Sequence, residues 1–387
     1  MTEPSLMCKA ARPRSGDDRT HLLALDGVRG LAILLVLLVH AADPNLHPFR
    51  GFRSILGNVV CSSGYGVQLF FVLSGFLITG ILLDSKGTPH YFKFFYARRI
   101  LRIFPLYYGT LLVFSACVLI FGIKDEHLFF KRLPWLLTYT SNIVITARRN
   151  WSFIFDGHSL GHFWSLAVEE QFYLVWPMII LWCSPRTIKR LCFVAIPVGL
   201  LSRTMLAWPG NNILGALVFL PCHVDSLALG ALLAVMVREN EPTVAKWAQP
   251  AMLMGCVGWL VSCVDMKVLV TYGMSGFILM SAGLLAAALY NRTLSLLFSN
   301  RMLRSFGKYS YAIYILHVLL LPFILPLKAR FGLPVFALLF IALSYCAGWL
   351  SWHVVEVHFL RLKTLFPADK GHSWRPRLSP QAGARIF

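Results

Sequence analysis

The sequence contains few charged residues, and negatively charged residues are fewer than positively charged ones. Charged residues make up 14% of the 387 positions, against about 25% in ordinary soluble domains. Only 17 residues are Asp or Glu, against 36 Lys and Arg. Hydrophobic residues reach 57%, and the mean hydropathy is +0.65. This composition excludes an ordinary soluble domain and indicates a polytopic membrane protein.

Patterns typical of metal or nucleic acid binding are also missing. The nine cysteines show no CxxC spacing and lie mostly in apolar stretches, which is typical of Cys used as a small hydrophobic residue. His158 and His162 are four residues apart, but no third ligand has a suitable spacing, so we expect no metal site. The basic residues punctuate apolar segments instead of forming a recognisable binding module, so we expect no nucleic acid partner.

Apolar segments of about 20 residues, the length that crosses a bilayer, recur along the chain. We therefore predict an all-α, polytopic membrane protein with about ten transmembrane helices. The predicted spans are 25–42, 66–83, 104–123, 165–183, 191–208, 213–237, 250–264, 268–290, 309–327 and 333–355. Lys and Arg are concentrated in the segments on the N-terminal side of the membrane, which predicts that both termini are cytoplasmic.

The seventh span is the weakest, because Asp265 and Lys267 leave only a short loop before the eighth. Without it the protein would have nine spans, and the basic loop 291–308 and the basic tail would face outside. The positive-inside rule therefore favours ten.

We expect one membrane domain over residues 25–360, flanked by two polar segments. Residues 1–24 lack the apolar core and cleavage site of a secretory signal, so we expect this cytoplasmic segment to stay on the chain. Residues 361–387 form a basic cytoplasmic tail that we expect to be poorly ordered beside the anionic inner leaflet. The longest connection, 124–162, should face outward, and loops of this length are usually functional or disordered.

Arg29 and His40 enclose ten apolar residues of the first predicted span. Ionisable side chains are costly inside a bilayer, so a functional role is the default interpretation of both. At 1.5 Å per residue they lie roughly 16 Å apart along a helix, with Arg29 near the inner face and His40 in the outer half. A structural alternative is that Arg29 extends to lipid phosphates and His40 bonds to a neighbouring helix.

Two further polar groups adjoin predicted spans. Arg98, Arg99 and Arg102 precede the third span, and Arg99 and Arg102 share a helix face. Their planar guanidinium groups suit phosphate, although an ordinary positive-inside signal would look the same. Glu169 and Glu170 lie near the outer start of the fourth span, where a carboxylate benefits from the helix dipole or simply lies at the interface.

Six segments together resemble acyltransferase family 3, the integral-membrane acyltransferases of bacterial cell-surface polysaccharides and related acceptors. The resemblance runs from about residue 25 to residue 356. The segments are LDGVRGLAILLVLLVHA, QLFFVLSGFLIT, ARRILRIFPLYY, HFWSLAVEEQFYLVWP, HVDSLALGALLA and SFGKYSYAIYILH.

The resemblance implies transfer of an acyl group, often acetyl, from cytoplasmic acyl-coenzyme A to a hydroxyl of a cell-surface polysaccharide, lipopolysaccharide or related glycan. Arg29 and His40 match the essential pair of the family, Arg99 and Arg102 match its Arg-x-x-Arg element, and Glu169 matches the Glu of its SLxxE segment. The segment around Ser74 and Gly75 matches a part of the family that is more plausibly structural. Many members have a basic residue and Pro-Phe after the Glu that matches Glu356, whereas Val357, His358 and Phe359 follow here, which makes a role for Glu356 doubtful.

The resulting hypothesis places the protein in the bacterial cytoplasmic membrane with acyl-CoA as its donor substrate and no bound cofactor. Arg29, Arg99 and Arg102 would bind the phosphates of CoA, and His40 would act as general base or become transiently acylated. Glu169 would orient His40, as a carboxylate does in hydrolase triads. The sequence leaves open the acceptor, the acyl chain and the oligomeric state.

Two other classes of protein remain as alternatives. In a polytopic transporter, or a carrier of lipid-linked sugar or acyl groups, Arg29, His40 and Glu169 would form a relay. No inverted repeat or pair of broken helices is visible to support that interpretation. A membrane scaffold would leave the combined motifs unexplained.

Overall fold

The computed structural model describes residues 16–42, 52–122, 124, 126–155, 157–239 and 243–366, and these are mostly helical. The longer helices are α1 (Gly16–Ala41), α3 (Gly66–Ser85), α4 (Tyr91–Phe121), α7 (Trp164–Trp182), α8 (Pro185–Ala207), α10 (Val224–Arg238), α11 (Thr243–Ser262), α13 (Met274–Tyr290) and α15 (Arg301–Ser351). The shorter ones are α2 (Phe52–Cys61), α5 (Glu126–Leu137), α6 (Ser141–Arg148), α9 (Ile213–Val218), α12 (Met266–Val268), α14 (Arg292–Phe298) and α16 (Val357–Arg361). A short antiparallel hairpin pairs β1 (Ile154–Phe155) with β2 (His158–Ser159).

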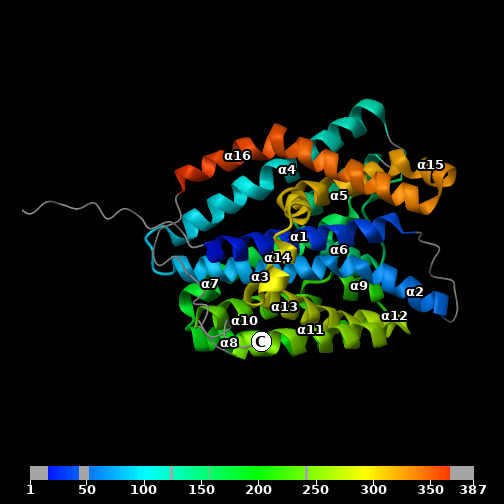
Figure 1. Ribbon diagram of the computed structural model, residues 1–387. Helices are drawn as coiled ribbons and strands as arrows, with labels where there is room; N and C mark the ends of the chain where they lie inside the picture. The colour runs from blue at the N-terminus through cyan, green and yellow to red at the C-terminus, as the bar shows by residue number, and fades with distance from the viewer. Residues whose placement is uncertain are drawn as a thin grey trace, which may run out of the picture.

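The long helices lie roughly side by side as a bundle (Figure 1). Helix α1 is central and packs against α15 and α3, α3 packs against α10, and α10 packs against α8. Helices α11 and α13 form a further packed pair. The α1, α3 and α15 helices therefore form the middle of the bundle, where the candidate site lies.

Six helical ranges of the described residues are long and apolar enough to cross a membrane. They are Leu23–Ala41, Gly57–Ser85, Tyr91–Phe121, Pro185–Ala207, Met266–Tyr290 and Arg301–Leu365. Large apolar side chains such as Leu112, Phe121 and Phe323 point outward, where lipid would cover them. The fold is that of an all-α, multi-pass membrane protein, while ten crossings and the cytoplasmic side of the termini stay predictions.

Helix boundaries differ from the predicted spans at several places, and the helix that holds Arg99 and Arg102, α4, begins at Tyr91 instead of residue 104. Helix α1 begins at Gly16, inside the predicted polar segment 1–24, because a helix can continue beyond the bilayer where no proline interrupts it. The ninth and tenth spans are two parts of α15, separated by Gly332, whose φ of 74° lies in the region that favours glycine. Residues 1–15 and 367–387 of the predicted terminal segments lie outside the described residues.

The sixth span, 213–237, was predicted as one continuous helix, and this prediction was wrong. The structure divides the range into two helices. Helix α9 ends before Phe219, whose backbone is extended, and a 3-10 turn (Leu220–Cys222) leads into α10. Pro221 explains the break, since it lacks the N–H that would bond to the carbonyl of Leu217 in a continuous helix. Residues 219–223 therefore join two helices that the hydropathy pattern merges.

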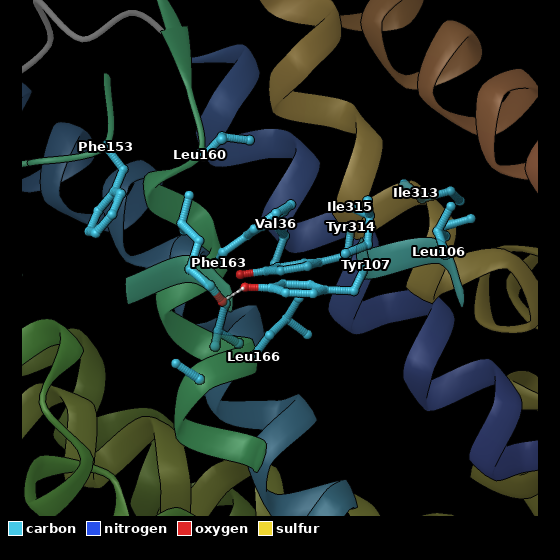
Figure 2. Packing of buried hydrophobic residues seen from close by; sticks show 14 of the residues in the cluster. Val36, Leu106, Tyr107, Phe153, Leu160, Phe163, Leu166, Ile313, Tyr314 and Ile315 are labelled. Carbon is cyan, nitrogen blue, oxygen red and sulfur yellow. Dashed lines mark hydrogen bonds between the residues drawn. The ribbon is translucent and has the colours of Figure 1, made fainter. Parts of the chain in front are cut away.

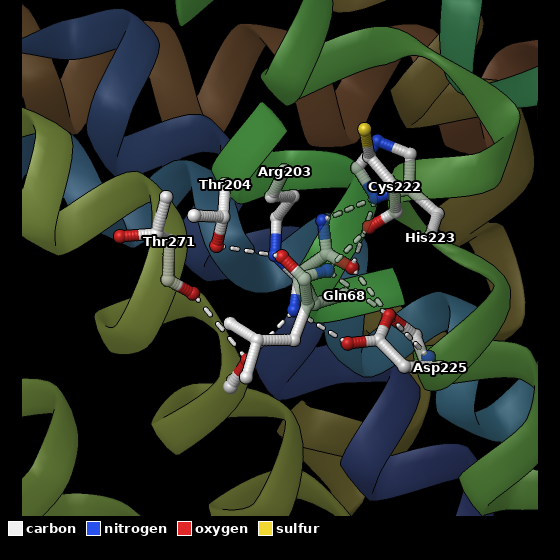
Figure 3. Close-up of polar contacts among 10 residues, drawn as sticks. Gln68, Arg203, Thr204, Cys222, His223, Asp225 and Thr271 are labelled. Atoms are coloured by element: carbon white, nitrogen blue, oxygen red, sulfur yellow. Dashed lines mark hydrogen bonds and ion pairs between the residues drawn. The ribbon is translucent and has the colours of Figure 1, made fainter. Parts of the chain in front are cut away.

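Polar side chains form hydrogen bonds with the backbone carbonyl groups that this break leaves without helical partners (Figure 3). The Arg203 guanidinium donates to the carbonyl of Cys222, and His223 Nε2 donates to the carbonyl of Leu217 at 2.9 Å. Arg203 also forms two hydrogen bonds with the Asp225 carboxylate, at 2.6 and 3.1 Å. Unpaired backbone groups are costly in a bilayer, so this network is a structural part of the fold.

Close helix contacts need glycine at two positions next to the candidate site. A Cβ on Gly307 of α15 would lie 1.8 Å from the carbonyl oxygen of Asp26, and one on Gly75 of α3 would lie 2.0 Å from that of Leu227. The first contact brings α15 against α1 beside Arg29, and the second brings α10 against α3 beside Ser74. The structural role expected for Gly75 is confirmed.

The long connection 124–162 carries its own structure, in which α5, α6 and the β1–β2 hairpin lie. Its apolar side chains join a large buried cluster shared with the central helices (Figure 2). Phe153 and Leu160 of this connection belong to it, together with Tyr107 of α4, Leu166 of α7 and Tyr314 of α15. The connection therefore covers the end of the bundle at which α7 begins.

Candidate active site

One pocket brings together polar residues from five helices. Arg29 of α1, Arg99 and Arg102 of α4, and Glu169 of α7 all line it. Its volume is about 90 Å³, a fraction of the 300–1,000 Å³ typical of sites that enclose a whole small molecule. The other polar lining residues are Ser74, Ser165, Tyr173, Ser310, Tyr311 and Tyr314.

Cationic groups dominate the pocket. Arg99 and Arg102 are one helical turn apart on α4, and the Arg99 guanidinium lies 5.3 Å from the centre of the Tyr173 ring, a cation–π distance. Arg29 Nη1 lies 3.6 Å from Oδ1 of Asp26, whose side chain is 45% exposed. Three guanidinium groups thus face a space lined by one carboxylate, that of Glu169, which favours an anionic ligand.

The contacts of Glu169 differ from those predicted. Its Oε1 accepts a hydrogen bond from Ser74 Oγ at 2.6 Å, and Ser74 Oγ accepts one from the Tyr173 hydroxyl at 3.2 Å. Glu169 is therefore held between α3 and α7, within the arginine pocket. The prediction that Glu169 orients His40 is not supported by these contacts, because the register of α7 places this carboxylate with Ser74 and the arginines.

His40 lies outside this set of lining residues, beside a second histidine. Its Nδ1 donates to the carbonyl of Val36 at 2.8 Å, which leaves Nε2 as the nitrogen without a proton in the neutral ring. The ring centroid lies 4.7 Å from that of His317, with the ring planes at 85°. His40 is partly exposed, whereas His317 is fully buried.

Tyr314 connects the pocket with the histidines. It lines the pocket, as does Ser165, and the Tyr314 hydroxyl bonds to Ser165 Oγ and donates to the carbonyl of His162 at 2.8 Å. Its ring also lies 5.6 Å from the His317 and His162 rings. Tyr314 thus lies between the arginine pocket, which it lines, and the two histidine rings that it contacts.

His162 adds a third imidazole to this end of the site. Its ring lies 5.3 Å from that of His317, and its Nε2 bonds to the carbonyl of Ile315 at 3.2 Å. Burial lowers the pKa of His162 to about 3, so it is neutral at ordinary pH. Among the described residues no group of three His, Cys, Asp or Glu side chains is placed to hold a metal ion.

Three residues singled out in the sequence, Arg98, Glu170 and Glu356, are not among the residues that line the pocket. Arg98 Nη1 donates to the carbonyl of Phe366 at 3.0 Å. Glu170 neighbours Glu169 but does not line the pocket, and Glu356 is 6% exposed. One carboxylate oxygen of Glu170 and one of Glu356 have no hydrogen-bond partner among the described residues.

Sequence reasoning missed the contact of Ser74 with Glu169 and that of His317 with His40. Ser74 gives no signal, since a Ser in an apolar helix often bonds only to its own backbone. His317 does give one, because it is an ionisable residue in the predicted span 309–327, which was the argument that selected His40. What the sequence could not show is that these two histidines meet.

Comparison with known proteins adds a family. Residues 22–353 match acyltransferase family 3, described as an acyltransferase domain. A Bacillus subtilis protein named "Putative peptidoglycan O-acetyltransferase YrhL" is 30% identical over 87% of this chain and 54% of its own length. The Listeria monocytogenes "Peptidoglycan O-acetyltransferase OatA" is 33% identical over 50% of this chain and 30% of its own.

A Staphylococcus aureus "Putative O-acetyltransferase SACOL0978" is 25% identical over 93% of this chain and 60% of its own. The chain thus spans about 60% or less of the length of these relatives. No solved structure shows significant similarity. The family match covers most of the chain and includes every pocket residue named above, and the chain therefore belongs to acyltransferase family 3.

Proposed function

We propose that this protein is a membrane O-acetyltransferase that moves an acetyl group from cytoplasmic acetyl-CoA to a hydroxyl of a cell-envelope glycan, in the bacterial cytoplasmic membrane. The observation that carries the proposal is the pocket in which Arg29, Arg99, Arg102 and Glu169 converge from three helices. Family membership supplies the reaction class, and the excess of cations supports an anionic donor.

The donor would bind with its charged and reactive ends apart. CoA carries its phosphates at one end and its thioester at the other, on a thin arm. A pocket of about 90 Å³ is too small for the nucleotide but suits a narrow chain. The guanidinium groups would hold phosphates at the pocket, and the arm would point past Tyr314 toward His40.

His40 would act as general base. Its Nδ1–H is held by the Val36 carbonyl, so Nε2 is available to take the proton of the acceptor hydroxyl. The hydroxyl oxygen attacks the thioester carbonyl, a C–O bond forms, and the C–S bond breaks. His40 then returns the proton to the leaving thiolate. An acyl-imidazole at the same Nε2 is the competing route, and acetylated His40 in a donor-only reaction would identify it.

Glu169 would serve the donor site instead of His40. Its carboxylate is fixed by Ser74 and lies in the pocket with the arginines. It would position Arg99, whose guanidinium packs over Tyr173, the residue that bonds to Ser74.

Peptidoglycan is the acceptor that the relatives favour. Two of them carry its name, although this chain matches at most 54% of their length. The connection 124–162, which we expect to face outward and which carries the β1–β2 hairpin, would be the part that contacts the glycan. Exopolysaccharide and lipopolysaccharide remain in the test as other acceptors.

The experiment follows radiolabelled acetyl from acetyl-CoA to peptidoglycan fragments, using the full chain in lipid nanodiscs. Arg99→Gln and Arg102→Gln should each raise KM for acetyl-CoA about tenfold, which corresponds to about 1.4 kcal/mol of lost donor binding. Arg98→Gln is the matched control, because it removes the same charge from the same segment but Arg98 does not line the pocket.

Unchanged KM in both pocket variants would contradict the donor assignment. Absence of label from peptidoglycan, exopolysaccharide and lipopolysaccharide alike would contradict the proposed transfer.

A further inference from the structure

The chain that follows the tenth predicted span returns to the helix that carries Arg99. Helix α16 and the 3-10 turn after it (Leu362–Leu365) pack against α4 (Figure 1). The Phe366 ring lies 6.2 Å from the ring of Phe94, and the Phe366 carbonyl accepts a hydrogen bond from Arg98 at 3.0 Å. The end of the described chain is therefore fixed beside the first turns of α4, next to the arginine pocket.

Lys363 lies in this segment and adds a cation next to the pocket. It does not line the pocket, but the side chains whose charges act most strongly on its ammonium group are Arg98 and the three pocket arginines. Lys363 is partly buried, whereas Arg361 of the same segment is exposed. Guanidinium groups repel a nearby ammonium group, and an anion bound between them would offset that repulsion.

The carboxylates near the pocket do not pair with Lys363. Glu169 lines the pocket, and Glu170 follows it on α7. Asp26 lies 3.6 Å from the pocket arginine of its own helix, and the charge of Glu356 acts on another pocket arginine. Among the described residues, none forms an ion pair or a hydrogen bond with the Lys363 side chain. Its ammonium group is thus open to an anionic ligand.

Acetyl-CoA, the donor of the proposed reaction, carries phosphate at two separate places. Its diphosphate joins the pantetheine arm to the nucleotide, and a 3′-phosphate lies on the ribose, farther from the thioester. A pocket of about 90 Å³ suits the arm but not the nucleotide. If the pocket arginines hold the diphosphate, the ribose and its 3′-phosphate lie outside the pocket, on the side away from His40.

We propose that Lys363 binds the 3′-phosphate of acetyl-CoA outside the pocket in which the arginines hold the diphosphate. This inference rests on the proposed function and adds to it a residue that selects the 3′-phosphorylated donor. Lysine suits this role, because an ammonium group on a flexible stem is a point charge that can meet a phosphate from several directions. Packing of α16 against α4 and the contact of Phe366 with Phe94 keep the segment in place.

The alternative is an ordinary lysine at the membrane surface. Leu362 and Leu365 are exposed beside Lys363 and would contact lipid, and a lysine there can extend its ammonium group to lipid phosphates. A role with lipid would apply to the exposed Arg361 as well and would not depend on which donor is used. The structure of the donor therefore separates the two interpretations.

The experiment compares acetyl-CoA with acetyl-3′-dephospho-CoA as donors for the full chain in lipid nanodiscs, with peptidoglycan fragments as acceptor. For the wild type we expect KM to be about tenfold higher for the dephosphorylated donor, with kcat unchanged. Lys363→Gln should raise KM for acetyl-CoA by about the same factor and leave KM for the dephosphorylated donor unchanged. Lys363→Arg should keep most of the preference, because it keeps the charge.

Two further variants are the controls. Arg361→Gln removes a positive charge from the same segment and should keep the wild-type preference between donors. Arg99→Gln should raise KM for both donors by the same factor, because both carry the diphosphate. The measurements are repeated in nanodiscs with and without anionic lipid, and thermal unfolding shows which variants fold.

Equal KM of the wild type for both donors would overturn the inference, whether or not the variants fold. It also fails if Lys363→Gln raises KM for both donors alike, or if Arg361→Gln loses the preference to the same extent. A preference that appears only in anionic lipid would assign Lys363 to the lipid surface instead. Failure of the proposed function looks different, because the wild type would then transfer acetyl from neither donor.

Discussion

Arg203 and the three arginines of the pocket lie in the same helical bundle, but their charges are matched to different extents by neighbouring groups. Arg203 is 0% exposed and makes two hydrogen bonds to Asp225, one to Ser275 Oγ at 2.7 Å and one to the Cys222 carbonyl. Arg29, Arg99 and Arg102 line a pocket in which Glu169 is the single carboxylate, and Glu169 is bonded to Ser74.

The difference separates structural from binding arginines. A buried arginine with a bidentate carboxylate and a backbone carbonyl has its charge matched inside the protein, so it stabilises the break between α9 and α10. The three pocket arginines have only Glu169 in the pocket lining and the half-exposed Asp26 at 3.6 Å from Arg29, which leaves positive charge to be matched by something that enters the pocket. We expect substitutions in the first group to change stability and those in the second to change activity.

Asp225→Ala should have the largest effect on stability. It leaves Arg203 buried without its counter-charge, which should lower the free energy of unfolding by about 3–5 kcal/mol. Glu169→Gln is the counterpart in the pocket and should change the free energy of unfolding by less than about 1 kcal/mol while reducing acetyl transfer. Denaturant titration of both variants in detergent micelles gives the two values, and equal losses of stability would remove the distinction between the two sites.

Ser74→Ala should affect activity more than stability. It removes the hydrogen bond that holds the Glu169 carboxylate in the pocket, so kcat/KM should fall about tenfold. Water can reach the freed carboxylate from the pocket, so the free energy of unfolding should fall by no more than about 1 kcal/mol. Thr79→Val is the control, because it removes another bond between α3 and α7, the one donated by Trp176 Nε1 at 2.8 Å, outside the pocket lining. It should cost about 1 kcal/mol of stability and leave transfer unchanged. Normal kcat/KM in Ser74→Ala would show that Glu169 does not depend on Ser74.

Asp84→Asn should have the smallest effect. The Arg238 and Asp84 side chains are 16% and 33% exposed, so solvent screens their 2.9 Å ion pair and its loss should cost at most about 1 kcal/mol. Unfolding of this variant at low and high salt measures the contribution, which should shrink as salt increases. A loss as large as that of Asp225→Ala would mean that burial does not set the value of ion pairs in this bundle.

The sequence predicted most of the helices and the shared face of Arg99 and Arg102, because both depend on local spacing, whereas the presence of Arg29 in the same pocket depends on how the helices pack. Apolar periodicity identified most spans, and Arg99 and Arg102 share a face because they are three residues apart in a helix. The break at Phe219 had a signal in Pro221, but the apolar run on both sides hid it. No feature of the sequence indicated that α1 begins at Gly16, because hydropathy shows where a helix leaves the bilayer and not where the helix ends.

The Arg29–His40 spacing, the Arg-x-x-Arg element and the family were determined by the sequence alone, since helix geometry converts residue number directly into height along the bundle. Which side chains meet at a given height was decided only by the tertiary structure. Glycine contacts such as Gly307 against Asp26 set how closely the helices approach, and helix packing sets how each is turned about its axis. That rotation brings Glu169 into contact with Ser74 and His40 into contact with His317. The spacing of residues within a single helix cannot predict such contacts between helices.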